Sequence, residues 1–205
     1  MNNPIRIALI DDDEAVLDSL RLFLTRRGIK VTPYSSADAF VADADAASFD
    51  CLVVDVRMPG MTGMDLVQWL RSTNATAAVI LITGHGDVDM AVAAIKLGAF
   101  DFIEKPFDEQ RLLVTIRAAA EQTRNRQDHA AEIRDLKARH GELSERQRQV
   151  MELAAAGLSN KEIGGRLGIS PRTVEIHRAW MMERMGARNL ADLVRIAMRV
   201  KELQN

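Results

Sequence analysis

Five short apolar runs alternate with amphipathic segments along the first half of the sequence, and no other feature restricts the fold as strongly. The runs have the length of β-strands and lie at residues 5–10, 30–34, 51–56, 78–83 and 100–105. Helical patterns separate them, at about 14–27, 35–46, 64–72 and 87–97. Strands that alternate with helices predict right-handed crossovers and a doubly wound parallel α/β sheet. Runs as apolar as LVV and VILI are typical of strands that are buried on both faces.

The sequence changes character after Pro106. From Asp108 to His140 it contains neither glycine nor proline, and it is rich in Ala, Arg, Glu and Gln. We therefore predict a long helix whose apolar start packs on the sheet. Its later part, 123–141, is interpreted as a helical linker. A flexible tether remains the alternative, because the apolar spacing there is too irregular for a coiled coil.

Four helical patterns and no strand pattern follow in residues 142–205. They cover about 144–157, 159–168, 170–186 and 189–203. Each begins at a residue type that caps helices well, namely Ser144, Ser159, Ser170 and Asn189. The chain is therefore expected to consist of a sheet domain (1–122), a linker (123–141) and an all-α four-helix domain (142–205).

The composition is that of a globular protein, with 47% hydrophobic and 27% charged residues. The longest apolar runs fall far short of the ~20 residues that a membrane span requires, and the N-terminus does not resemble a secretory signal. The single cysteine, Cys51, has no partner for an internal disulfide. We therefore expect a cytoplasmic protein without membrane contact.

The two halves of the chain differ in charge. Residues 1–124 carry a net charge of −6, whereas residues 125–205 carry +4. A basic half joined to an acidic half indicates separate roles and makes the C-terminal half the candidate for binding a polyanion.

Charged and hydroxyl side chains stand where the predicted strands end. These residues are Asp11 and Asp12 after the first strand, Asp55 at the end of the third, Thr83 at the end of the fourth and Lys105 at the end of the fifth. With strand order 2-1-3-4-5 these ends are neighbours, at the edge where doubly wound sheets bind ligands. Clustered carboxylates require a cation, and a few oxygen ligands favour Mg²⁺ (or Mn²⁺) over a soft metal. A carboxylate is also a competent phosphoryl acceptor.

Each of these residues alone has a simpler interpretation, because an Asp after a strand commonly forms a turn or caps a helix. We expect Asp13 to be such a cap. The occurrence of suitable residues at four separate strand ends is what favours a functional site.

Four motifs, LIDDDEAV, VVDVRMPGMTG, ILITGHGD and AFDFIEKPF, resemble in order and spacing the receiver domain of bacterial two-component signalling. This resemblance covers residues 1–122 and implies that Asp55 accepts a phosphoryl group from a sensor histidine kinase. It implies a metal site formed by Asp11, Asp12, Asp55 and the backbone carbonyl of Arg57. It further implies that Thr83 and Lys105 meet phosphoryl oxygens, that Phe102 is an aromatic switch, and that the Lys105–Pro106 peptide bond is cis.

On this interpretation we expect that the chain is not an enzyme and that it assists its own Mg²⁺-dependent phosphorylation and dephosphorylation. The alternative is an aspartyl-phosphate hydrolase that uses the same carboxylates. Such an enzyme needs a general acid/base as well, and the residue two positions after Asp55 is Arg57 rather than a second carboxylate. The sequence also shows no insertion for a substrate lid.

Two of the C-terminal helical patterns, joined by a tight turn around Gly168, are typical of a helix-turn-helix. In the second helix a helical spacing predicts a core face made by Val174, His177, Met181 and Met185. The opposite face, with Arg172, Glu175, Ile176 and Ala179, is predicted to meet base edges. Phosphate contacts are assigned to Lys161, Ser170, Thr173 and Arg178. Duplex DNA is favoured over RNA, because no aromatic platform for single strands is visible.

Two further expectations concern packing in this domain. Gly164 and Gly165 are expected to permit a close helix crossing, because glycine inside a helix costs roughly 1 kcal/mol relative to alanine. Trp180 is unusual in a recognition helix and is expected to pack against a neighbouring helix.

The segment LSERQRQVMELAAAGLSNKEIGGRLGISPRTVEIHRAWMMERMGARNLADLVRIA resembles the output domain of the NarL/LuxR/FixJ family, and the whole chain resembles FixJ-type response regulators. The resemblance implies a homodimer that forms on phosphorylation through the surface of the fourth helix and fifth strand. It also implies binding to a two-fold duplex DNA site and transcription activation with RNA polymerase. Control of nitrogen fixation by oxygen follows from the subfamily resemblance alone. The remaining alternative is a signalling scaffold whose helical domain binds protein.

Overall fold

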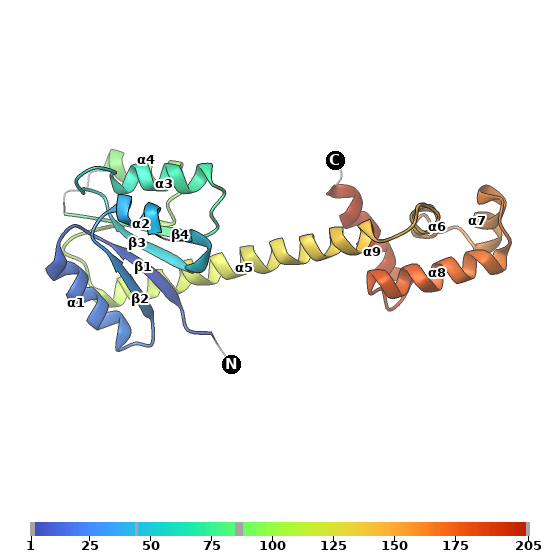
Figure 1. Ribbon diagram of the computed structural model, residues 1–205, viewed down its shortest axis with the longest axis horizontal. Coiled ribbons are helices and arrows are strands. Elements are labelled where there is room, and N and C mark those ends of the chain that lie inside the picture. The colour runs from blue at the N-terminus through green and yellow to red at the C-terminus, as the bar shows by residue number, and fades with distance from the viewer. Residues whose placement is uncertain (1–2, 44, 85–87, 204–205) are drawn as a thin grey trace. The chain divides into compact units, whose positions relative to one another are not determined.

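The computed structural model describes residues 3–43, 45–84 and 88–203 (Figure 1). The chain divides into an N-terminal unit, Met1–Asp128, and a C-terminal unit, His129–Asn205. The division falls inside the segment 123–141, for which the sequence predicts a linker, and the domain bounds 1–122, 123–141 and 142–205 stay a prediction. No helix in the described ranges is long and apolar enough to cross a membrane.

The N-terminal unit is the predicted doubly wound sheet. Its strands are β1 (Arg6–Ile10), β2 (Lys30–Tyr34), β3 (Cys51–Asp55), β4 (Ala78–Thr83) and β5 (Asp101–Glu104). They are parallel and lie in the order β2-β1-β3-β4-β5, which confirms the predicted topology. The connecting elements are α1 (Glu14–Thr25), α2 (Ala37–Asp43), the 3₁₀ turn η1 (Ala46–Ser48), α3 (Gly63–Ser72) and α4 (Val88–Leu97), and α5 (Glu109–Gly141) follows β5.

Helices cover both faces of the sheet (Figure 1). Alternate side chains of a strand point to opposite faces, so Leu52 and Val54 of β3 join the core under α2, α3 and α4. Cys51 and Val53 join the core under α1 and the first half of α5. The expected cap at Asp13 is confirmed, since its carboxylate accepts hydrogen bonds from the first turn of α1.

The first part of α5 belongs to the N-terminal unit, as far as Asp128. Thr123 Oγ1 accepts a hydrogen bond from the Ala78 amide at 3.0 Å, at the start of β4. Arg124 donates two hydrogen bonds to Asp50, at 3.0 and 2.9 Å. These contacts hold residues that the sequence assigns to the linker against the amino ends of β3 and β4.

The C-terminal unit is all-α and contains α6 (Glu145–Ala155), α7 (Asn160–Leu167), α8 (Pro171–Met185) and α9 (Leu190–Glu202). All four predicted N-caps are confirmed, because each side chain accepts a hydrogen bond from the first turn of its helix. The last part of α5 packs here. Leu136 lies against the core of this unit, and Glu132 forms two hydrogen bonds with Arg199 of α9, at 3.1 and 2.9 Å.

Only one of the two adjacent glycines in α7 is required by packing. A Cβ atom on Gly164 would lie 2.7 Å from the carbonyl oxygen of Ile169 in the turn before α8. A Cβ atom on Gly165 would meet no atom within 4 Å. The expected close approach is therefore confirmed at Gly164, where it involves the turn, and is wrong for Gly165.

Candidate functional site

Three charged side chains meet at the carboxyl end of the sheet. Lys105 Nζ donates a hydrogen bond to Asp55 Oδ1 at 2.7 Å and another to Asp11 Oδ2 at 3.0 Å. Both aspartates are buried, with 8% and 4% of their surface exposed. The parallel order places the end of β3 between the ends of β1 and β4, so the predicted neighbours do lie together.

Burial and charge oppose each other at this site. Burial raises the pKa of the Asp11 carboxyl above its usual value, and hydrogen bonds from the Asp13 amide and Lys105 offset only part of that effect. Burial also disfavours the charge of Lys105, but hydrogen bonds to Asp55 and Asp11 outweigh it and raise the pKa of the ammonium group. The positively charged group that lies between the two carboxylates is therefore the Lys105 ammonium.

The loop after β3 turns back toward Asp55. The Arg57 amide donates to Asp55 Oδ2 at 2.7 Å, which fixes the orientation of the carboxylate. Farther along the loop, Gly60 has a φ of 75°, and the Met61 amide donates to Asp38 Oδ2 at 3.1 Å. Asp38 of α2 thus accepts a hydrogen bond that fixes this loop. No local pattern in the sequence indicated this role.

The other predicted site residues surround this centre. Asp12 is exposed beside Asp11, and Thr83 is 1% exposed at the end of β4. The Lys105 amide donates to the Thr83 carbonyl oxygen at 2.7 Å, and the Lys105–Pro106 bond is cis, as expected. Phe102 is half-buried on β5 against the core on the α3 and α4 side. Residues 85–87 of the motif ILITGHGD lie outside the described residues.

The donor atoms at this edge suit a hard divalent cation, because they are carboxylate and main-chain oxygens rather than sulfur or imidazole nitrogen. The Lys105 ammonium bridges Asp11 and Asp55, and Asp12 remains exposed. In the part of the chain that the structure describes, no group of three or more His, Cys, Asp or Glu side chains is arranged to hold a metal ion. The residue types of the predicted site thus fit Mg²⁺, while the described arrangement places a lysine between two of them.

A second candidate surface is formed by α7 and α8. The turn between them uses Gly168 at a φ of 66°, and Ser170 caps α8 by accepting a hydrogen bond from the Thr173 amide. Arg178 Nη1 donates to Asn160 Oδ1 at 2.8 Å, which ties α8 to the first residue of α7. This contact was not predicted, because the two residues are 18 positions apart.

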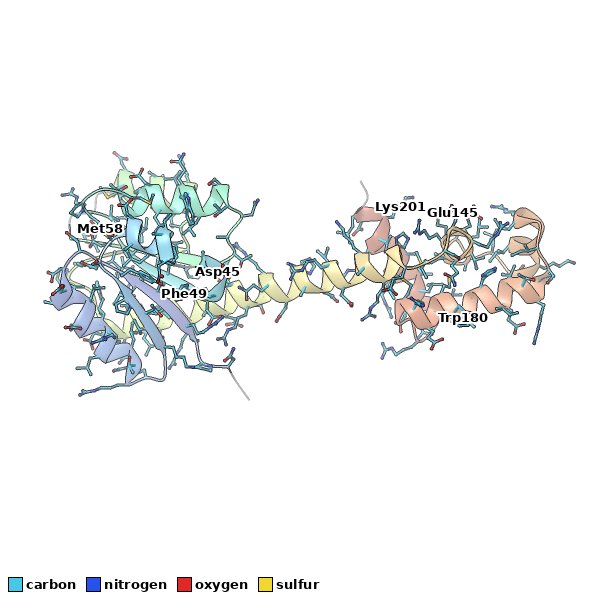
Figure 2. All side chains as sticks on the ribbon, viewed as in Figure 1. Asp45, Phe49, Met58, Glu145, Trp180 and Lys201 are labelled. Carbon is cyan, nitrogen blue, oxygen red and sulfur yellow. The ribbon has the colours of Figure 1, made fainter. Side chains whose placement is uncertain are left out.

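The two faces of α8 are divided as predicted. Val174, Met181 and Met185 are buried, and His177 is half-buried. The residues assigned to base edges are all exposed, namely Arg172, Glu175, Ile176 and Ala179. Among those assigned to phosphates, Lys161 and Ser170 are exposed, whereas Thr173 and Arg178 are half-buried. Trp180 is 55% exposed (Figure 2) and is not among the described side chains that pack against the core of this unit, so its expected packing against a neighbouring helix stays a prediction.

Comparisons with known proteins match a different family model in each half of the chain. A family model described as response regulator receiver domain matches residues 7–117, and one described as bacterial regulatory proteins, luxR family, matches residues 141–197. The chain is 45% identical over 199 residues to the transcriptional regulatory protein FixJ of Bradyrhizobium diazoefficiens, covering 97% of each chain. It is 40% identical to the response regulator protein TodT of Pseudomonas putida, covering 96% of this chain and 86% of TodT.

Solved structures agree with these sequence matches. The response regulator StyR is 35% identical, covers 96% of this chain with 100% of its own, and superimposes with a TM-score of 0.90. Full-length FixJ from B. japonicum is 43% identical, with coverage of 98% and 99% and a TM-score of 0.59.

Proposed function

Because this chain belongs to the response regulators that join a receiver domain to a LuxR-type DNA-binding domain, we propose that Asp55 is the phosphoacceptor that controls DNA binding through α8. The protein is a FixJ-like response regulator, and phosphorylation is the means by which it regulates transcription.

The observation that supports Asp55 most strongly is its position at the end of β3, buried and hydrogen-bonded to Lys105 Nζ. In the transfer, an Asp55 carboxylate oxygen forms a bond to phosphorus while the bond from phosphorus to the kinase histidine nitrogen breaks. The product is an acyl phosphate, and the histidine leaves as the neutral imidazole after protonation. Lys105 offers its charge to the added phosphoryl oxygens.

Receiver domains generally bind Mg²⁺ at the phosphorylation site. We assign the ion here, Mg²⁺ or Mn²⁺, to Asp11, Asp12, Asp55 and the backbone carbonyl of Arg57. When bound, it neutralises charge on the transferred phosphoryl group. The chain accepts the group and loses it again, without turnover of a small substrate.

The switch is assigned to Thr83 and Phe102. The Thr83 hydroxyl donates a hydrogen bond to the new phosphoryl oxygens, and Phe102 then turns toward the space that Thr83 leaves. Phe102 lines a shallow groove together with Val92 and Ile95 of α4, which are 45% and 50% exposed. A change in the orientation of Phe102 therefore changes the surface formed by α4 and β5. We infer that the phosphorylated chain forms a homodimer through this surface.

The dimer would present two copies of α8 to a two-fold site in duplex DNA. Base edges are assigned to Arg172, Glu175, Ile176 and Ala179, and phosphates to Lys161, Ser170, Thr173 and Arg178. We further propose that bound dimers activate transcription with RNA polymerase in the cytoplasm. A role in oxygen-controlled nitrogen fixation rests on the similarity to FixJ alone.

Labelling the full chain with radioactive acetyl phosphate, followed by sedimentation, tests these assignments. The wild type should take one label and shift from monomer to dimer mass, whereas Asp55→Asn should take none and remain monomeric. Asp18→Asn, which changes an exposed carboxylate on α1, is the matched control and should behave as the wild type. Stable label on Asp55→Asn would disprove the phosphoacceptor, and a labelled wild type at monomer mass would disprove the dimer.

A further inference from the structure

The outer face of α8 carries an exposed apolar pair that packing does not explain. Ile176 is 50% exposed and Trp180 is 55% exposed, although the other large apolar residues of this helix lie in or against the core. Tryptophan is strongly buried on average in folded proteins. In addition, no hydrogen bond to the Trp180 indole is found among the residues that the structure describes.

The pair continues a row of side chains that begins at the start of the helix. Arg172, Ile176 and Trp180 are four residues apart, so they lie on one ridge along α8. The Arg172 side chain is 83% exposed and reaches Glu175 at 3.4 Å. At this spacing Trp180, labelled in Figure 2, follows Arg172 and Ile176 along the exposed surface of α8.

We propose that Trp180, with Ile176, reads the C5-methyl groups of thymines in the major groove and is a determinant of sequence specificity. This inference rests on the proposed binding of duplex DNA by α8. The thymine methyl is the apolar feature of the major groove, and apolar side chains recognise it by contact. The indole ring offers a large apolar face for such contact at low entropic cost, since it has few rotatable bonds.

The charged residues near Ile176 and Trp180 favour DNA as the molecule that this pair contacts. Arg172 shares the ridge, and Lys161 is exposed at the start of α7, in a unit whose sequence is net positive. Positive side chains in the same unit as an apolar contact suit the major groove, where phosphates flank the base edges, and Arg172 also pairs with Glu175. A protein partner would be the other possible occupant, and it gives a different result in the experiment below.

The first test compares thymine with uracil, which lacks the methyl group. The probe is a duplex selected from a random pool with the phosphorylated full chain, and a second copy carries uracil in place of every thymine. The wild type should lose about fourfold in affinity for each methyl group it contacts, as expected for burial of one methyl. Trp180→Ala should bind the thymine duplex more weakly and lose most of the difference between the two duplexes.

Two variants separate a base contact from a change in folding or charge. Trp180→Phe keeps an aromatic surface and should restore much of the preference for thymine. Met198→Ala removes a 60% exposed side chain from α9 and should leave both affinities unchanged. The dependence of affinity on salt should be the same for Trp180→Ala and the wild type, because no phosphate contact is lost.

The second test uses the fact that the chain has two tryptophans. In a Trp69→Phe background, the emission of Trp180 should become shielded from acrylamide when the thymine duplex binds.

Duplex binding without shielding, or equal binding of thymine and uracil duplexes, would overturn the inference and leave the proposed function standing. Shielding that is complete before DNA is added would assign the pair to a protein contact and also overturn it. No binding of any duplex would disprove the proposed function together with the inference.

Discussion

Lys105 contacts two aspartates at once, and this determines how the N-terminal site is described at the scale of single residues. One ammonium group lies 2.7 Å from Asp55 and 3.0 Å from Asp11, so the two carboxylates share its single positive charge in the described state. An added phosphoryl group on Asp55 brings new acceptor oxygens for the same ammonium. The lysine therefore links the charge state of Asp55 to the end of β5.

A second buried carboxylate, Asp50, gives a prediction for stability. Burial disfavours its charge, but hydrogen bonds from Arg124 and the Arg6 amide outweigh burial and lower the pKa of Asp50. A lowered pKa stabilises the folded state fully at pH values above the ordinary carboxyl pKa, and this contribution is lost as the pH falls through the lowered value. Asp50→Asn should therefore cost about 1–3 kcal/mol at pH 7, and this cost should decline as the pH falls below the ordinary carboxyl pKa.

Urea unfolding of both proteins at several pH values measures this difference, in a Trp180→Phe background so that Trp69 reports the N-terminal unit. Asp18→Asn is again the control, because its exposed ion pair with Arg21 should contribute little. Stability curves for Asp50→Asn and the wild type that run parallel from pH 7 to pH 3 would contradict the role of the Arg124 contact.

At this scale the sequence predicted which residues meet but not how they bond. Asp11, Asp55 and Lys105 were identified because parallel strands end at one edge of the sheet. Three contacts depend on side-chain directions that tertiary packing sets. They are the bridge formed by Lys105, the hydrogen bond from the Met61 amide to Asp38, and the hydrogen bond from Arg178 to Asn160. No local spacing encodes those directions.

At the scale of elements, α7 offers a direct test of local packing. Gly164 and Gly165 are neighbours in one helix, yet only Gly164 faces the turn at Ile169. Gly164→Ala places a methyl group 2.7 Å from a backbone oxygen and should destabilise α7 and α8 by about 1–3 kcal/mol. Gly165→Ala meets no atom and should stabilise them by up to about 1 kcal/mol through helix propensity.

Hydrogen exchange of the α7 and α8 amides measures both effects in the full chain. Protection should fall in Gly164→Ala and rise in Gly165→Ala, while the sheet amides serve as an internal reference. Equal protection in the two variants would show that the approach at Gly164 does not limit the packing of this turn.

The elements themselves were predictable because their signals are local. Apolar runs, helical periodicity and N-cap residues gave the strands and helices, since each depends on neighbouring residues. The assignment of α5 was harder. Its anchors, Arg124 with Asp50 and Glu132 with Arg199, join residues 74 and 67 positions apart, so a linker pattern and a packed helix look alike in the sequence.

At the scale of the whole molecule, two compact units divide the chemistry. The acidic N-terminal unit holds the aspartate site, and the basic C-terminal unit holds the helix-turn-helix. The charge of the sequence differs in the same sense, since residues 1–124 carry −6 and residues 125–205 carry +4. The central claim is that phosphorylation of Asp55 in one unit sets the DNA affinity of the other.

The affinity of the full chain for the selected duplex, measured by fluorescence anisotropy with and without acetyl phosphate and Mg²⁺, tests that claim most directly. The wild type should bind roughly tenfold more tightly after phosphorylation, within the usual range of coupling between two sites. Asp55→Asn should bind with the unphosphorylated affinity under both conditions. Equal affinities of phosphorylated and unphosphorylated wild type, or the same increase in Asp55→Asn, would contradict the account.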